Sequence, residues 1–184
     1  DITLSASTTF ASVFWPERER LKAVRHTVRP TLSYIFIPEA VQTDIPYFDA
    51  VDSVAAASTV TYGLNNTVTG RFDSNGIKTY HDFLYFNISQ SYNFVEATRK
   101  LTSPTDRRLP YSDALAELVL RPAEWSAVSA KGQYNVYENW FTSYDTAINL
   151  KNKRGDYLNI AHRFLRNTTR YIEIPSQLYN LTYS

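Results

Sequence analysis

The sequence predicts an all-β protein, an antiparallel up-and-down transmembrane β-barrel sheet of about nine long strands. The first observation is a period of two over residues 59–72, where polar or small residues at odd positions alternate with mostly apolar residues at even positions. Such alternation indicates a strand with one wet face. The second is length, because soluble strands usually have about 5–6 residues, whereas a tilted strand that crosses a bilayer needs about 9–11. The third is that no stretch has the pattern of a long helix.

The alternation recurs along the whole chain. In residues 79–94, Leu84, Phe86 and Ile88 point one way, while most of the residues between them are polar. The predicted strands lie at 2–10, 31–37, 59–72, 79–94, 113–121, 128–136, 143–151, 158–164 and 177–183. The strands at 31–37, 113–121 and 177–183 are shorter or weaker than the others. We expect residues 1–184 to form a single barrel segment with no separate second domain.

The composition narrows the classes of function. Aromatic residues make up 15% of the chain, with 14 tyrosines, as expected for strands that have one membrane-facing side. No window holds the about 20 apolar residues of a transmembrane helix. A net charge of +1 gives no broad basic surface for nucleic acid, and the lack of cysteine excludes disulfides and thiolate chemistry.

Short and long links alternate between the predicted strands. The short links, rich in Gly, Pro and Asn, are 73–78, 122–124 and 152–155, and the long ones are 38–57, 95–112 and 167–176. Outer-membrane barrels have short periplasmic turns and long outer loops, so 38–57 and 95–112 are predicted to face outside. The link 16–29, with its run of charges, falls on the periplasmic side and is longer than this rule expects.

Aromatic residues gather where the predicted strands meet their links. They are Phe14, Trp15, Tyr47, Phe48, Trp125, Trp140 and Phe141. Such rings form girdles at the two interfaces of a membrane, although aromatic residues are also enriched in any β-sheet.

Several segments, taken in order, resemble one known family. The run RHTVRPTLSYIFIP at 25–38, followed by QTDIPYFD at 42–49, is similar to part of the barrel in the lipopolysaccharide-assembly family LptD. In that family a His-Thr-x-x-Pro start, a Tyr-rich strand ending in Pro and a Gln-x-Asp-x-x-x-(Phe/Tyr)-Asp loop occur in this order. Further similar segments lie at 65–71, 86–92 and 120–126. The resemblance covers most of the chain, but nothing resembles the family's periplasmic jelly-roll domain, signal peptide or cysteines.

The resemblance implies that the chain is an internal part of a larger C-terminal outer-membrane barrel. Family barrels have about 26 strands, so that about nine strands would be roughly a third of one. The implied function is to translocate and assemble lipopolysaccharide into the outer leaflet of the Gram-negative outer membrane, without catalysis and without a cofactor. The implied partners are lipopolysaccharide, a plug lipoprotein like LptE, a periplasmic lipopolysaccharide-transport bridge and outer-membrane lipid.

The resemblance also assigns a role to the polar positions, which would line the hydrated lumen of the barrel. Hydroxyl and amide groups can exchange hydrogen bonds with water and with sugar hydroxyls. The candidate lumen-facing wall comprises Thr61, Asn65, Thr67, Thr69, Asn87, Ser89, Ser91, Asn93, Ser129, Gln133 and Asn135. The family's lateral exit lies between its first and last strands, and no gate residue is predicted in this chain.

The three histidines are weak candidates for catalysis. His81 lies beside Asp82, but adjacent strand residues point to opposite faces, and the sequence places no nucleophile near them. His26 lies among basic residues, and His162 falls on the predicted lipid face near Phe164. We interpret all three as interfacial or loop residues.

Three carboxylates, Asp44, Asp49 and Asp52, share one predicted loop. They could take up a divalent cation, but the Gly and the terminal Glu of an EF-hand are missing. A solvated acidic loop is the favoured interpretation, and no metal site is predicted.

Two other classes of protein remain open. The chain has the length of a complete small barrel of about eight strands, which would have a structural or adhesive role. It could also be a soluble β-sandwich that binds carbohydrate through Tyr and Trp, although strands this long with one polar face are unusual there. Detergent dependence separates the two, because a sandwich stays monomeric without detergent and a barrel does not.

Overall fold

The computed structural model describes residues 1–16, 20–39, 56–74, 76–167 and 174–183, with only the backbone of 167 and 174–183. In this part of the chain the elements are β1 (Ile2–Ser7), β2 (Phe10–Phe14), β3 (Leu21–Ile37), β4 (Ala57–Ser74), β5 (Ile77–Asn93), α1 (Phe94–Thr98), β6 (Ala114–Ala123), β7 (Ser126–Asn135), β8 (Trp140–Lys151), β9 (Tyr157–Asn167) and β10 (Ile174–Tyr183). Among the described residues, no helix has the length and hydropathy needed to span a membrane.

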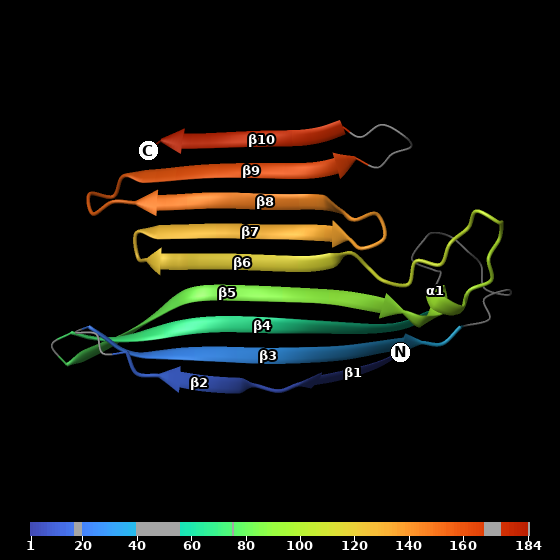
Figure 1. Cartoon of the computed structure of the whole chain (residues 1–184), viewed down its shortest axis with the longest axis horizontal. Helices are drawn as coiled ribbons and strands as arrows, with labels where there is room; N and C mark the ends of the chain where they lie inside the picture. Colours follow the sequence, from blue (N-terminus) through green and yellow to red (C-terminus); the bar gives the residue numbers. More distant parts are fainter. Residues whose placement is uncertain (17–19, 40–55, 75, 168–173, 184) are drawn as a thin grey trace.

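All the strands belong to one antiparallel sheet, in which each strand from β3 onward pairs with the next strand in sequence (Figure 1). The order is β1-β3-β4-β5-β6-β7-β8-β9-β10, and β2 also pairs with β3. Ile2 lies opposite Phe36 and Phe10 lies opposite Val28, so β1 and β2 follow one register along the same edge of β3. The predicted up-and-down sheet with nine strand positions is therefore confirmed.

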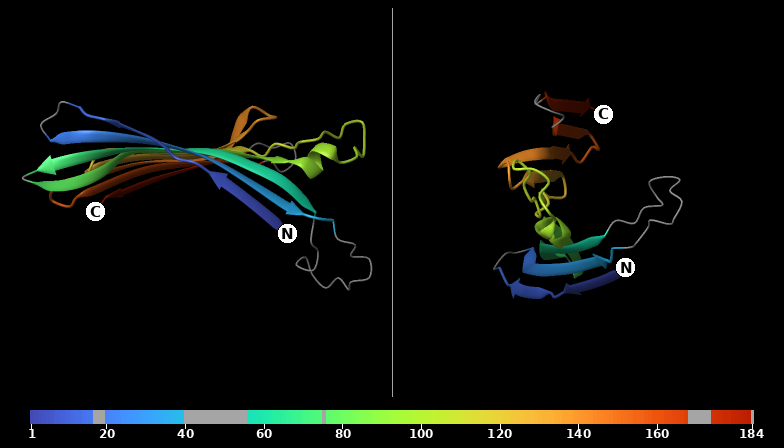
Figure 2. Two further views of the ribbon diagram at one scale, coloured as in Figure 1. Left: turned by 90° about the horizontal axis from the view of Figure 1, so that it is seen from below. Right: turned by 90° about the vertical axis from the view of Figure 1, so that its right-hand side faces the viewer.

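The sheet is a single twisted layer that does not close on itself (Figure 2). One edge is formed by β1 and β2 and the other by β10. An open sheet with two strand edges is consistent with a segment of a larger barrel, because closure is what removes edges from a membrane sheet.

Pro30 explains why β1 and β2 are two strands. The amide of Thr8 donates to the carbonyl of Pro30 at 3.4 Å, so the backbone polar groups of Pro30 face the β1/β2 edge. Proline has no N–H and cannot return a hydrogen bond to that edge. The pairing is therefore interrupted between Ser7 and Phe10, opposite the proline.

Strand β3 is much longer than the sequence predicted. It starts at Leu21 and has 17 residues, whereas the expected strand was 31–37 and the segment 16–29 was expected to be a link. Charges along 21–29 resemble a loop, but Arg25 and Arg29 take the polar positions of a strand, opposite Thr69 and Asn65 of β4. The connection from β2 to β3 spans only 15–20, which removes the exception to the rule of short turns.

The two longest connections lie at the same end of the sheet (Figure 1). The long-loop end carries the connections 38–56 and 94–113, together with the shorter 136–139. The short-turn end carries 75–76, 124–125 and 152–156. This alternation agrees with the prediction from the sequence.

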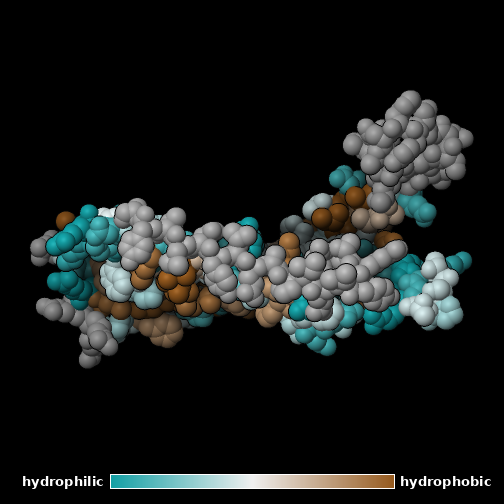
Figure 3. Space-filling model, turned by 90° about the horizontal axis from the view of Figure 1, so that it is seen from above, coloured by the Kyte–Doolittle hydropathy of each residue, from teal (hydrophilic) through white to brown (hydrophobic). Residues whose placement is uncertain are grey.

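The sheet has almost no buried core. Ala23 alone is buried among the described side chains, and large apolar residues such as Leu4, Leu64 and Ile160 are exposed. Figure 3 shows hydrophobic residues between two more hydrophilic ends of the molecule. A sheet with one apolar face must cover that face against another layer or against lipid, and this chain supplies no second layer in its described part.

The loop 94–113 has its own internal structure. Asn93 caps α1, because its Oδ1 accepts from two backbone amides of the first turn at 2.9 and 3.1 Å. Arg99 donates to the Glu96 carboxylate at 2.6 Å and to both carboxylate oxygens of Asp106 at 2.6 and 2.7 Å. Arg99 therefore ties both halves of the loop together.

The same contacts shift the titration of the loop carboxyls. Hydrogen bonds from Arg99 and from the backbone amide of Thr102 hold the pKa of Asp106 well below its usual range. Arg99 and the backbone amide of Leu109 likewise lower the pKa of Glu96. Both carboxyls are thus charged at neutral pH, as the ion pairs require.

Candidate functional site

The polar positions of β4 and β5 form one continuous surface. Thr61 lies opposite Ser91, and their hydroxyls are 2.7 Å apart. Asn65 lies opposite Asn87 in the same register. Residues directly opposite in an antiparallel pair share a face, so these side chains form rows across the two strands.

The remaining candidate residues of these two strands extend the surface along the sheet. Thr67 donates to the Oδ1 atom of Asn65 at 3.5 Å. Thr69 donates to the Oδ1 atom of Asp82 at 2.6 Å, on the far side of a bulge at Phe83. Ser89 lies opposite Gly63, the smallest residue of the surface.

The candidate residues of β7 share this face although they lie two strands away. Ser89 pairs with Leu115 of β6, which in turn pairs with Gln133. Ser129 lies two rows further toward the short-turn end and pairs with Val119. The register thus places Ser129 and Gln133 on the polar face.

Two of the candidate residues take part in connections at the long-loop end. Asn93 caps α1, as described above. The Oδ1 atom of Asn135 accepts from the amides of Tyr137 and Glu138, each at 3.0 Å. Their amide oxygens are therefore engaged in turns, which alternation alone does not reveal.

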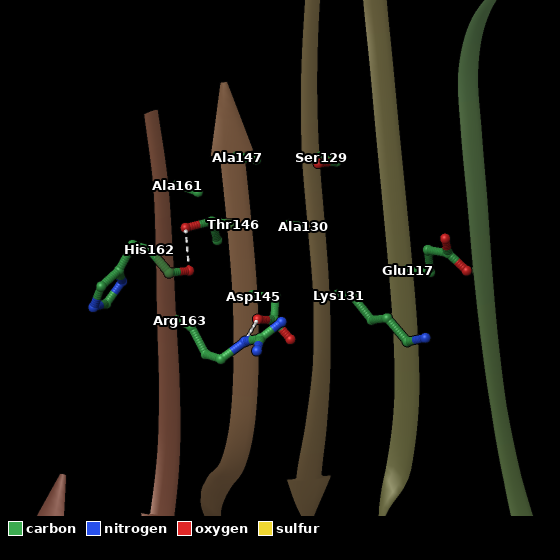
Figure 4. Close-up of a pocket in the computed structure, with 10 residues that line it drawn as sticks. All are labelled: Glu117, Ser129, Ala130, Lys131, Asp145, Thr146, Ala147, Ala161, His162 and Arg163. Atoms are coloured by element: carbon green, nitrogen blue, oxygen red, sulfur yellow. Dashed lines mark hydrogen bonds and ion pairs between the residues drawn. The ribbon is translucent and has the colours of Figure 1, made fainter. Parts of the chain in front are cut away.

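A row of charged residues crosses the same face and was missed by the sequence analysis. The register aligns Asn87, Glu117, Lys131, Asp145 and Arg163 directly opposite one another across β5 to β9. Arg163 forms an ion pair with Asp145, and the side chains are drawn in Figure 4. A signal was present, since each of β6, β7, β8 and β9 carries a charged residue at a polar position, but only the register aligns them.

The three histidines lie on three separate strands and form no catalytic arrangement with one another. His26 lies opposite Val68, and the Nε2 atom of His81 is 2.7 Å from the carbonyl of Arg121. His162 packs edge-on to Tyr144, with 5.4 Å between the ring centroids. All three lie within strands, so none of them is a loop residue.

His81 and Asp82 diverge as the sequence predicted. His81 pairs with Gly70, and Asp82 pairs with the preceding residue, Thr69. No relay between their side chains follows from this geometry.

The carboxylates Asp44, Asp49 and Asp52 lie outside the described residues. Within the described ranges, no group of three or more His, Cys, Asp or Glu side chains could hold a metal ion.

Aromatic residues lie at both ends of the sheet, several of them beside arginine. At the short-turn end, Trp15 is 68% exposed and its ring lies 5.6 Å from the Arg71 guanidinium carbon. At the long-loop end, the Arg166 guanidinium carbon lies 4.5 Å from the Trp140 ring. Tyr47 and Phe48 fall outside the described residues. Aromatic rings at the two ends of membrane-spanning strands are typical of membrane interfaces.

Comparison with protein families gives a match over nearly the whole chain. A family model described as LPS transport system D matches residues 3–183. The chain belongs to the LptD family. A comparison with curated proteins finds no match.

Membership of the LptD family fixes the general role. LptD-family proteins act in lipopolysaccharide transport and assembly at the outer membrane of Gram-negative bacteria, and the family is one of transporters rather than enzymes. The all-β antiparallel sheet with alternating faces fits an LptD-type β-barrel.

Proposed function

We propose that this chain forms part of the wall of a larger outer-membrane barrel that inserts lipopolysaccharide into the outer leaflet. The observation that supports this proposal is the two-faced sheet. A polar face runs from β3 to β9, and no other layer in the described part covers the opposite, apolar face. In this proposal the polar face lines the lumen, and the apolar face meets lipid. The long-loop end then faces the outside and the short-turn end the periplasm.

The chemistry of the two faces suits the cargo. Lipopolysaccharide carries a bulky sugar portion, which needs water and hydrogen-bonding groups, and acyl chains, which must stay out of water. The polar face supplies hydrogen-bond donors and acceptors for the sugar portion. They are the hydroxyls of Thr61 and Ser91 and the amides of Asn65 and Asn87. The proposed partners are a plug lipoprotein like LptE and a periplasmic bridge that delivers the lipopolysaccharide.

Photo-crosslinking in the full-length protein in cells tests the assignment of the two faces. A photo-reactive residue at Thr67 or Asn87 should capture lipopolysaccharide or a plug lipoprotein, because both positions lie on the polar face. The matched controls are Val68 and Phe86, the next residues along the same strands, which should capture bulk lipid.

Failure of this pattern would take a clear form. If Thr67 and Asn87 captured only bulk lipid, the faces would be reversed. If neither pair met lipid and the chain stayed monomeric in detergent-free buffer, a soluble carbohydrate-binding sheet would replace the barrel.

A further inference from the structure

A hollow of about 440 Å³ lies over β6 to β9 on the polar face, and its volume is within the range of small-ligand pockets. We define the polar hollow by the seven lining residues at polar positions of β6 to β9. They are Glu117, Ser129, Lys131, Asp145, Ala147, Ala161 and Arg163 (Figure 4). The other three lining residues occupy alternate positions, whose side chains belong to the opposite face.

The floor of the polar hollow is a row of small residues. Ser129 pairs with Ala147, which pairs with Ala161, so three short side chains lie side by side across β7, β8 and β9. The next row toward the long-loop end is the charged row, with much longer side chains. The next row toward the short-turn end contains Asn149 and Asn159, whose amides are joined by a 2.6 Å hydrogen bond.

The charges around the polar hollow cancel. Glu117 and Asp145 are acidic and Lys131 and Arg163 are basic, and they alternate along the row. Arg163 already donates to the Asp145 carboxylate. An anionic group placed in the hollow would meet two carboxylates as well as two cations, so the row offers little net attraction to a phosphate.

The same row is rich in hydrogen-bonding capacity. Carboxylates accept, the ammonium and guanidinium groups donate, and a sugar hydroxyl does both. Figure 4 shows the Lys131 side chain extending toward β6, away from the Asp145–Arg163 pair, which leaves the alanine floor open. The methyl groups of Ala147 and Ala161 are apolar, so the C–H face of a sugar ring can pack against them.

We propose that the polar hollow binds an uncharged saccharide unit of lipopolysaccharide through its hydroxyls, with the charged row as donors and acceptors and the alanine floor beneath. This inference rests on the proposed function, because it requires the polar face to meet the cargo. It adds a defined binding site on that face, the saccharide site. This site would bind neutral sugar hydroxyls in preference to phosphate groups.

The experiment uses the full-length protein, purified in detergent, with a photo-reactive residue at Ser129 in the floor row. Lipopolysaccharide should crosslink at this position. The competing probes are the delipidated saccharide of lipopolysaccharide after removal of its phosphates, the same saccharide with its phosphates, and inorganic phosphate. The two saccharides should compete equally and inorganic phosphate should not compete.

Two matched variants each add a bulky side chain, one on the polar face and one on the apolar face. Ala147→Leu places a bulky side chain in the polar hollow and should lower the Ser129 crosslink about tenfold, the loss expected when a ligand position is occluded. Ala116→Leu makes the same change on the opposite face and should leave the crosslink unchanged. Capture at Asn87 reports separately whether cargo reaches the polar face at all.

The outcomes separate the two proposals. Two outcomes would overturn the saccharide site and leave the proposed function standing. The first is capture at Asn87 with none at Ser129, and the second is equal crosslinks in Ala147→Leu and Ala116→Leu. Competition by inorganic phosphate, or a crosslink that weakens strongly as salt is raised, replaces the saccharide site with an anion site. Loss of capture at both Asn87 and Ser129 overturns the proposed function as well.

Discussion

At the scale of single residues, Gly70 shows how closely the apolar face is packed at the short-turn end. A Cβ atom added there would lie 3.0 Å from Leu21 Cδ1 and would press into the Phe83 ring more closely than real Cβ atoms approach. Gly132, on the same face, offers a contrast, because an added Cβ would meet its nearest atoms at an ordinary 3.5 Å.

The two glycines therefore make a matched test of packing. Gly70→Ala should destabilise the folded barrel by about 1–3 kcal/mol, the usual cost of overpacking. Gly132→Ala should be neutral or stabilising by up to about 1 kcal/mol, because alanine restricts the unfolded chain. Unfolding of both variants in detergent, followed by tryptophan fluorescence, measures the difference. Equal stabilities would show that Phe83 moves aside at little cost.

At the same scale, Pro30 limits the pairing at one edge of the sheet. Pro30→Val restores a backbone N–H that faces β1 and β2, and keeps an apolar residue at an apolar position. One added hydrogen bond contributes about 0.5–1.5 kcal/mol, so amides around Thr8 should exchange roughly 2–10-fold more slowly. Hydrogen exchange of the full-length barrel measures this, with the centre of β4 as internal reference. Faster exchange around Thr8 would contradict the account of the break.

At the scale of elements, the loop 94–113 should hold its structure far into acid. The folded loop lowers the pKa of Asp106 and Glu96, so its ion pairs contribute stability above the ordinary carboxyl pKa of about 4. That contribution is lost only as the pH falls through the lowered pKa values. Limited proteolysis of the loop should therefore give the same rate at pH 7 and pH 5 and rise only in strong acid.

Two variants check the role of Arg99 in the loop. Arg99→Gln removes the donor to both carboxyls, and the loop should then be cleaved rapidly at neutral pH as well. Lys100→Gln removes a neighbouring exposed cation and serves as the control. Similar cleavage of the two variants would mean that Arg99 does not hold the loop.

At the scale of the whole molecule, an uncovered apolar face governs behaviour in water. The described part has two small buried residues, Ala23 and Gly70, and many exposed large apolar side chains, and both edges of the sheet are open. Such a sheet is expected to associate through its face and edges when nothing covers them.

The isolated chain should therefore need detergent. Without it, light scattering and gel filtration should report large assemblies, and with it the tryptophan fluorescence should shift to the blue as Trp15, Trp125 and Trp140 enter an apolar phase. A monodisperse monomer in plain buffer would contradict this expectation and favour a soluble sheet.

The sequence predicted most of the strands and the alternation of polar and apolar positions along them. Alternation is a local consequence of the pleat, so Thr61 and Ser91 could be assigned to the polar face before any pairing was known. The prediction failed at β3, because the charged segment 16–29 was expected to be a link although it is strand from Leu21 onward. It also did not reveal that Asn93 and Asn135 would engage their amide oxygens in connections.

The sequence by itself determined the all-β class, the two-faced strands, the alternation of short and long links and the resemblance to the LptD family. Only the tertiary structure decided the register, and with it the charged row, the polar hollow and the break opposite Pro30. The physical reason is the range of the interactions. Pleat alternation depends on neighbouring residues, whereas the meeting of Glu117, Lys131, Asp145 and Arg163 depends on hydrogen-bonded pairing between strands far apart in the chain.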